Sequence, residues 1–209
     1  MPLLYYVRHG ETDFNAEQRL QGRQDTVLNA RGRSQAKDSG ELLRGLFARN
    51  RRDPSDFVYV ASPLRRTRET MEILRPQLGL APHPYTTDDR LLEISYGAWE
   101  GLTLPEIETR MPGLLAERER DKWDFVPPDG ESYREMAARI SDWYASLTRD
   151  TVVAAHGGGV RVLMALFNVL SKEEAAHAQI AQGVVYVFAD GTMTVYPSND
   201  APRRGGFSG

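Results

Sequence analysis

The sequence predicts an α/β fold built on a mostly parallel sheet. Short apolar runs of strand length alternate along the chain with longer segments of helical period, which is the pattern of strand–helix–strand units. Two of these runs lead directly into a histidine, His9 and His156, and such folds bind ligands at the carboxyl ends of their strands. A length of 209 residues favours one domain, so we expect a single domain over 1–209.

The first strand is predicted at Leu3–Val7, an apolar run that ends in Arg8-His9-Gly10. A helix over residues 30–48 follows, because apolar residues recur there at helical spacing, at Ala36, Leu43 and Phe47. Charged and proline-containing residues 49–54 end this helix.

The second strand is predicted at Phe57–Ala61. Ser62 and Pro63 form a favourable N-cap and N1 pair, so we expect the next helix to begin there. The inner face of that helix is predicted to consist of Leu64, Thr67, Met71 and Leu74.

The middle of the chain is less regular. The stretch 91–128 combines Gly, Pro, two Trp and many charges, and it predicts short helices at Leu104–Arg110 and Leu114–Lys122. We interpret residues 91–130, approximately, as a lid-like insertion. Ser132 and Glu135 then form a capping box that starts a long helix. Its helical period continues through Tyr133, Met136, Ala137, Ile140, Tyr144 and Leu147.

A third buried strand is predicted at Thr151–Ala155, and it leads into the glycine-rich turn His156-Gly-Gly-Gly159. The helix after this turn is marked by Val160, Leu163, Met164 and Phe167. Val184–Phe188 and Thr192–Tyr196, joined by Asp190-Gly191, predict a hairpin or two edge strands.

Composition excludes several classes of protein. With 26 Lys and Arg against 29 Asp and Glu, the net charge is −3, which argues against a nucleic-acid partner held by overall charge. The absence of cysteine excludes disulfides, thiol nucleophiles and cysteine-based metal sites. The chain shows no signal peptide and no membrane span, so we expect a cytoplasmic protein without a membrane partner. A homodimer is the default expectation for its assembly, and residues 197–209 predict a loose tail.

Two clusters of polar residues follow the first two strands. In Arg8-His9-Gly10-Glu11-Thr12, with Asn15 shortly after, a guanidinium could bind phosphate while a neutral imidazole attacks phosphorus. Alone, an Arg and a His in a polar loop would be the simpler interpretation. The second cluster holds Arg65, Arg66 and Arg68, which point about 100° apart per residue, so at most one or two can face one ligand. An ordinary charged surface helix is the alternative there.

Two further clusters have the same ambiguity. The glycines after His156 could form a phosphate cradle from free N–H groups, or simply a tight strand-to-helix turn. The stretch from Arg90 to Gly101 offers Glu93 and Glu100. A carboxyl near a phosphate site can protonate a leaving oxygen. The alternative is that both are ordinary acidic loop residues.

Together and in this order, the motifs resemble those of a known family. The patterns R-H-G-E-T-x-x-N, S-P-L-x-R-T-x-x-T, L-x-E-x-x-Y-G-x-W-E-G and A-H-G resemble the histidine phosphatase superfamily, the phosphoglycerate mutase-like group, and most of all its short phosphatase members. The resemblance extends from Leu3 to about Tyr196. It implies a three-layer α/β/α sandwich with a mostly parallel central sheet.

The resemblance also implies roles for single residues. His9 would be the nucleophile that becomes phosphohistidine, and Glu93 would be the general acid and base. Residues that would hold the phosphate or substrate are Arg8, Arg66, His156, Asn15, Gln21, Gly22 and Gly157, whereas Arg65 falls outside the site. Two nearby guanidiniums should keep His9 neutral and therefore nucleophilic. Such an array implies no cofactor and no metal.

Two departures from the family pattern bear on the reaction. Phe14 stands where the family often has Trp, which changes a pocket contact more than the chemistry. The segment between Glu93 and His156 is shorter than in the family's mutases, so we favour hydrolysis of a small phosphomonoester. A phosphoglycerate mutase using the same site is the main alternative. A phosphoprotein phosphatase and an inactive phosphate-binding scaffold are further ones.

Overall fold

We describe residues 2–197 in a computed structural model of the chain. The predicted tail lies outside these residues except for Pro197, which ends the last strand. Within the described part, no helix is both long and apolar enough to cross a membrane.

Six strands form one sheet in the order β3-β2-β4-β1-β5-β6. The pairs β3–β2, β2–β4 and β4–β1 are parallel, whereas β5 is antiparallel to both β1 and β6. The strands are β1 (Leu4–Arg8), β2 (Val58–Ala61), β3 (Thr86–Thr87), β4 (Thr151–Ala155), β5 (Val184–Ala189) and β6 (Thr192–Pro197). The predicted mostly parallel sheet and C-terminal hairpin are confirmed.

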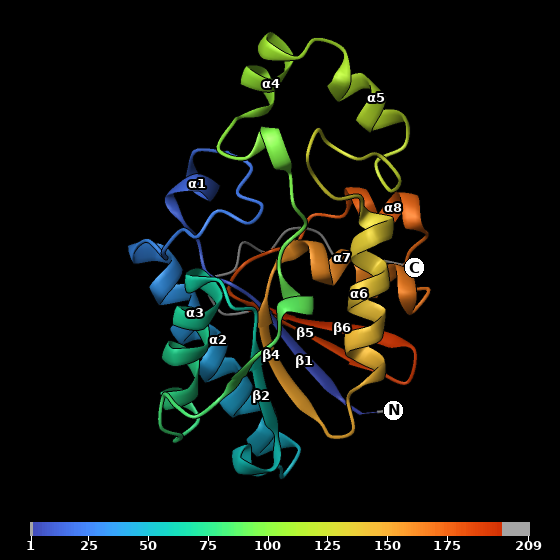
Figure 1. Ribbon diagram of the computed structural model, residues 1–209. Helices are drawn as coiled ribbons and strands as arrows, with labels where there is room; N and C mark the ends of the chain where they lie inside the picture. The colour runs from blue at the N-terminus through green and yellow to red at the C-terminus, as the bar shows by residue number, and fades with distance from the viewer. Residues whose placement is uncertain (1, 198–209) are drawn as a thin grey trace.

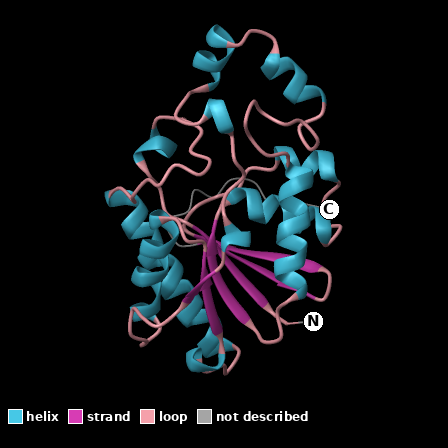
Figure 2. Ribbon diagram, viewed as in Figure 1, coloured by secondary structure: helices cyan, strands magenta, loops and turns pink. Residues whose placement is uncertain are grey.

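Helices lie on both faces of this sheet and make the three layers (Figures 1 and 2). The α-helices are α1 (Asp13–Ala16), α2 (Ala30–Arg49), α3 (Arg65–Gln77), α4 (Leu104–Arg110), α5 (Leu114–Arg120), α6 (Tyr133–Ala145), α7 (Gly157–Leu166) and α8 (Lys172–His177). Single 3₁₀ turns lie at Pro54–Asp56, Asp89–Leu91 and Gly97–Trp99. The short helices α4 and α5 project beyond the sheet, at the top of Figure 1.

The core follows from the alternation of side chains along each strand. Val152 and Ala154 of β4 pack with Phe47 of α2 and Met71 of α3 on one face. Val153 and Ala155 pack on the other face, in a cluster that includes Met136, Ile140, Trp143, Val160 and Leu163. Successive residues of a strand point to opposite faces, so β4, which is buried throughout, needs apolar residues at every position.

The prediction that α3 starts with Ser62 as its N-cap is wrong. The helix begins at Arg65, and the residue before it, Leu64, makes no side-chain cap. The predicted inner face is nevertheless buried, because the helical period does not depend on where the first turn begins. The glycines after His156 also differ from prediction, since they form the first turn of α7 rather than a loop.

Candidate active site

The ends of three parallel strands bring two histidines and a serine together. Arg8 pairs with Ala155 in the β1–β4 register, and the next residue, His9, donates its N–H to the carbonyl of Ala155 at 2.9 Å. On the other side of β4, Ser62 donates its N–H to the carbonyl of Ala154 at 3.0 Å. His9, His156 and Ser62 are therefore neighbours at the carboxyl edge of the sheet, as the topology predicts.

His9 is held with one particular nitrogen free. Its ring centroid lies 5.3 Å from that of His156, with the rings inclined at 64°. His9 Nδ1 lies 2.7 Å from the carbonyl oxygen of Gly10. A carbonyl only accepts, so Nδ1 carries the proton and the neutral ring presents Nε2 with its lone pair.

Burial and charge keep this imidazole neutral. His9 is 2% exposed, and burial, followed by the positive charges of Arg66 and Arg8, lowers its pKa well below the usual 6.5. The same cause, with Arg66 next in importance, lowers the pKa of His156. The prediction of a neutral histidine beside guanidiniums is consistent with this arrangement.

His156 is fixed by residues of two neighbouring chain segments, Ser62 after β2 and Tyr6 in β1. Its Nε2 lies 2.8 Å from the hydroxyl of Ser62. The hydroxyl of Tyr6 donates to the His156 carbonyl at 2.8 Å and accepts from its N–H at 3.1 Å. His156 Nδ1 is buried and has no hydrogen-bond partner.

The two predicted arginines are anchored by carbonyl groups. Arg66 is completely buried and donates from Nη1 to the Gln24 carbonyl at 2.7 Å and from Nη2 to the Gly22 carbonyl at 2.8 Å. Arg8 donates from Nη1 to the carbonyl of Ile180. The Nε of each is buried without a partner. Burial lowers the pKa of Arg66 to about 10, so it remains a cation at neutral pH.

This anchoring leaves positive charge unbalanced. Within residues 2–197, neither arginine has a carboxylate within 4.0 Å. Buried donors without partners are costly, and guanidinium N–H groups bind phosphate or carboxylate oxygens particularly well. The strand ends therefore form a site that favours an anion.

Glu93 reaches this site from the irregular segment that follows the 3₁₀ turn at Asp89–Leu91. Its Oε1 accepts from the N–H of Ile94 at 3.0 Å and from the N–H of Gly158, in the first turn of α7, at 3.2 Å. A Cβ on Gly158 would lie 2.3 Å from that oxygen. Glycine is therefore needed there for the carboxylate to approach the helix.

The predicted substrate-contact residues divide into two groups. Asn15 and Gly157 lie at the site: Asn15 Oδ1 accepts at 3.1 Å from Gln182, which also donates to the His9 carbonyl at 3.1 Å, and Gly157 begins α7. Gln21 instead accepts from Thr26 at 2.6 Å within its own loop. Gly22 contributes through its carbonyl, which holds Arg66.

Sequence reasoning missed several residues that touch the predicted site residues, among them Ser62, Tyr6 and Gln182. The sequence predicts Ser62 as a helix cap, although its position at a strand end, four residues before the motif arginine Arg66, is the available signal. Tyr6 looked like an ordinary strand residue. Gln182 contacts His9 from 173 residues away in the sequence, and no local sequence pattern distinguishes it.

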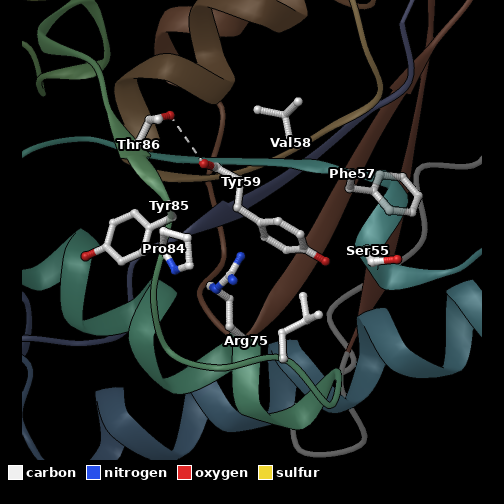
Figure 3. A pocket seen from close by; sticks show the side chains of 9 residues that line it. Ser55, Phe57, Val58, Tyr59, Arg75, Pro84, Tyr85 and Thr86 are labelled. Carbon is white, nitrogen blue, oxygen red and sulfur yellow. Dashed lines mark hydrogen bonds between the residues drawn. The ribbon is translucent and has the colours of Figure 1, made fainter.

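A separate cavity of about 390 Å³ lies between β2 and α3 (Figure 3). Its wall includes Phe57, Tyr59 and Tyr85, and Arg75 lies over the Tyr59 ring with its guanidinium carbon 4.5 Å from the centroid. Phe57 precedes β2, whereas Ser62 follows its other end. The cavity is therefore distant from the histidines and belongs to another part of the fold.

Comparison with known proteins agrees with this fold and site. The sequence profile of the histidine phosphatase superfamily (branch 1) matches residues 4–194. The chain is thus an enzyme of this superfamily. Its relatives include both phosphatases and phosphoglycerate mutases.

Three relatives illustrate the range. A glucosyl-3-phosphoglycerate phosphatase of Mycobacterium tuberculosis is 36% identical over 78% of this chain and 73% of its own. A 2,3-bisphosphoglycerate-dependent phosphoglycerate mutase of Afipia carboxidovorans is 29% identical over 91% of this chain and 94% of its own. Among solved structures, a mycobacterial glucosyl-3-phosphoglycerate phosphatase complexed with VO3 superposes with a TM-score of 0.74, at 29% identity, covering 90% of this chain and 91% of that one.

Proposed function

We propose that the protein is a phosphatase that hydrolyses a small phosphomonoester through a phosphohistidine on His9. One observation carries the proposal: three buried nitrogens without partners, Arg8 Nε, Arg66 Nε and His156 Nδ1, belong to side chains gathered around a neutral imidazole. A phosphoryl group is an anion whose oxygens would accept from the two guanidinium N–H groups. His156 Nδ1 would donate to it as well in the tautomer in which Ser62 donates to Nε2. The free His9 Nε2 is a nucleophile for its phosphorus.

The proposed reaction has two steps. In the first, His9 Nε2 forms a bond to phosphorus, the ester P–O bond breaks, and Glu93 gives its proton to the leaving oxygen. In the second, Glu93 takes a proton from a water molecule, whose oxygen attacks phosphorus and releases phosphate and neutral His9. Arg8 and Arg66 stabilise the charge on the transferring oxygens in both steps.

Further cations near Arg8 support a substrate with a second acidic group. Arg8 Nε and Arg161 Nη1 lie 3.5 and 3.6 Å from the point that a Cβ on Gly157 would occupy, so two guanidiniums flank this glycine. Arg161 is oriented by the Ala178 carbonyl at 3.0 Å and by the Tyr133 hydroxyl at 3.3 Å. One phosphate bound by Arg8 and Arg66 would leave Arg161 available for another anion.

Lys122 adds to this charge from the segment after α5. The ring of the next residue, Trp123, stacks on Tyr133 with centroids 5.8 Å apart, and the hydroxyl of Tyr133 contacts Arg161. Burial, followed by the charges of Arg118 and Arg161, lowers the pKa of Lys122 to about 8. We therefore propose a phosphomonoester that also carries a carboxylate or a second phosphate. The phosphoglycerate names of the relatives agree with this class.

The principal test is phosphate release by wild type and His9→Ala from p-nitrophenyl phosphate and a panel of esters in EDTA. We expect release by wild type and a loss of at least about 10³-fold in the variant, because removing a nucleophile removes the covalent route. Circular dichroism would establish that the variant is folded. A folded variant with near wild-type activity would refute the nucleophile assignment.

The same panel separates the alternatives. The mutase alternative is favoured by the 29% identical relative that spans nearly the whole chain, and it predicts conversion of 3-phosphoglycerate to 2-phosphoglycerate with little phosphate release. A phosphopeptide as the best substrate would indicate a phosphoprotein phosphatase. A folded wild type that turns over no ester would indicate a phosphate-binding scaffold.

The second acidic group is tested with 3-phosphoglycerate and glycerol 3-phosphate, which differ by a carboxylate. Lys122→Met should lower kcat/KM for the first about tenfold and leave the second nearly unchanged, since only the first gains a charge-assisted contact. The preference should also fall as pH rises through about 8, where Lys122 loses its proton. Lys37→Met, at an exposed lysine of α2, is the control. Equal effects on both esters would contradict the proposed class.

A further inference from the structure

The segment that carries Glu93 has little regular structure of its own. Residues 92–96 lie between two 3₁₀ turns, Asp89–Leu91 and Gly97–Trp99, and form no strand or helix. Side-chain hydrogen bonds must therefore fix this piece of backbone if Glu93 is to keep its position.

One guanidinium, from Arg139 on α6, contributes several hydrogen bonds to this backbone. Arg139 Nη1 donates to the carbonyls of Arg90 and Leu92, each at 2.6 Å, and Nη2 donates to the carbonyl of Glu93 itself at 3.2 Å. Nε and Nη2 also bind the two oxygens of Glu131, both at 2.8 Å. All five N–H groups of the fork are thereby used.

Glu131 also contacts the backbone after Glu93 and a second arginine. Its Oε2 accepts from the N–H of Ser95 at 3.4 Å and from Arg23 Nη2 at 3.2 Å. The Arg139 and Glu131 side chains are 18% and 13% exposed, so water screens their interaction only partly. The pair holds the backbone on both sides of Glu93, at residues 90–93 and at Ser95.

We propose that Arg139 and Glu131 are positioning residues for Glu93, fixing the main chain from which its carboxyl reaches the leaving oxygen. The inference rests on the proposed function, in which Glu93 is the proton donor. Neither residue touches the reacting atoms; they act through the backbone of the residue that does. A displacement of about 1 Å in a catalytic group can cost about 10²-fold in rate.

The arginine fork is specifically required for this role. A lysine has one compact ammonium with three donors and cannot hold three carbonyls and a bidentate carboxylate in one plane. Arg139→Lys therefore keeps the charge near the site but loses most of the geometry.

The test uses leaving groups that differ in their need for a proton. p-Nitrophenolate departs unprotonated at neutral pH, whereas the alkoxide of glycerol 3-phosphate needs the acid. Arg139→Gln should lower kcat/KM about 10–100-fold for glycerol 3-phosphate and less than about threefold for p-nitrophenyl phosphate. kcat/KM reports the steps up to phosphoryl transfer to His9, so the later role of Glu93 as a base does not enter.

Two further variants decide the outcome together with Arg139→Gln. Glu93→Gln is the reference and should show the same selective loss; if it does not, Glu93 is not the proton donor, and the acid step of the proposed function and this inference both fail. If Glu93→Gln is selective but Arg139→Gln loses both activities equally, the pair is merely structural and the inference is overturned. Full recovery of the alkyl ester by Arg139→Lys would overturn it as well.

Folding defects are separated by two other substitutions. Glu131→Gln keeps the size of the side chain and should show the same selectivity in weaker form, so it carries the test if Arg139→Gln does not fold. Arg134→Gln is the matched control, because Arg134 lies on the same helix and pairs with Asp124 without contacting residues 90–95. It should leave the ratio of the two activities unchanged, and a shift equal to that of Arg139→Gln would contradict the assignment.

Discussion

The two halves of the candidate site are held in place by different means. The anion-binding half contains His9 and His156, which directly follow two buried, paired strands. The backbone register of these strands fixes the positions of both histidines without the help of side-chain contacts. The half that carries Glu93 lies in an irregular segment, where the side chains of Arg139 and Glu131 fix the backbone. Rigid strands suit groups that must hold a phosphoryl group in one place. A segment fastened by side chains leaves room for change in the position of the proposed proton donor, Glu93.

The largest difference between the two halves is expected from Arg66→Met. This change removes a buried cation from the anion-binding half, and it should lower kcat/KM about 10²–10³-fold, as removal of a preorganised donor does. Unlike Arg139→Gln, it should affect aryl and alkyl esters alike, because both transfer the same phosphoryl group. A loss confined to alkyl esters would show that the two halves are not functionally distinct.

A smaller effect is expected at the contact between the halves. Gly158→Ala introduces a Cβ 2.3 Å from Glu93 Oε1, so the carboxylate must move while His9 and the arginines stay in place. kcat/KM for an alkyl ester should fall about 10–100-fold, with a smaller fall for p-nitrophenyl phosphate. Gly45→Ala, where a Cβ would meet nothing within 4 Å, is the control and should behave as wild type.

The smallest expected effect is a decrease in the free energy of unfolding as the pH falls. His9 and His156 have pKa values well below 6.5 in the fold, whereas unfolded histidines titrate near 6.5. As pH falls below that value the unfolded chain binds more protons, so the free energy of unfolding decreases with falling pH. At pH 5.5 the decrease should be about 1.4 kcal/mol for each histidine.

Urea unfolding at pH 7.5 and 5.5 measures this difference. His9→Asn should reduce the loss of stability between the two pH values by about one histidine's share. An unchanged pH dependence in that variant would mean that His9 titrates normally in the fold.

Much of the fold was predictable, because its main signals are local. Buried strands such as Thr151–Ala155 and the helical period after Ser132 need only neighbouring residues. Arg66 could be separated from Arg65 by its position in the motif, and the structure buries the first and exposes the second. The short helix α8 and the two-residue strand β3 were missed, since so few residues carry no distinguishable period.

The supporting residues of the site could not be predicted in the same way. Arg139 is 46 residues from Glu93 in sequence and resembles any charged position on a helix. Ser62 looked like a helix cap because Ser-Pro often begins a helix, but here its hydroxyl meets His156. Such contacts depend on the assembled sheet, and the motif residues alone do not specify them.

The carbonyl anchoring of Arg8 and Arg66 also has a consequence for handling the protein. Because their charge is not neutralised by a nearby carboxylate, dissolved phosphate or sulfate can bind to the folded chain and has no equivalent site on the unfolded one. An anion at 100 times its dissociation constant would raise the free energy of unfolding by about 2.7 kcal/mol. The choice of buffer would then affect the apparent thermal stability, and the phosphate released in the proposed reaction would act as both an inhibitor and a stabiliser.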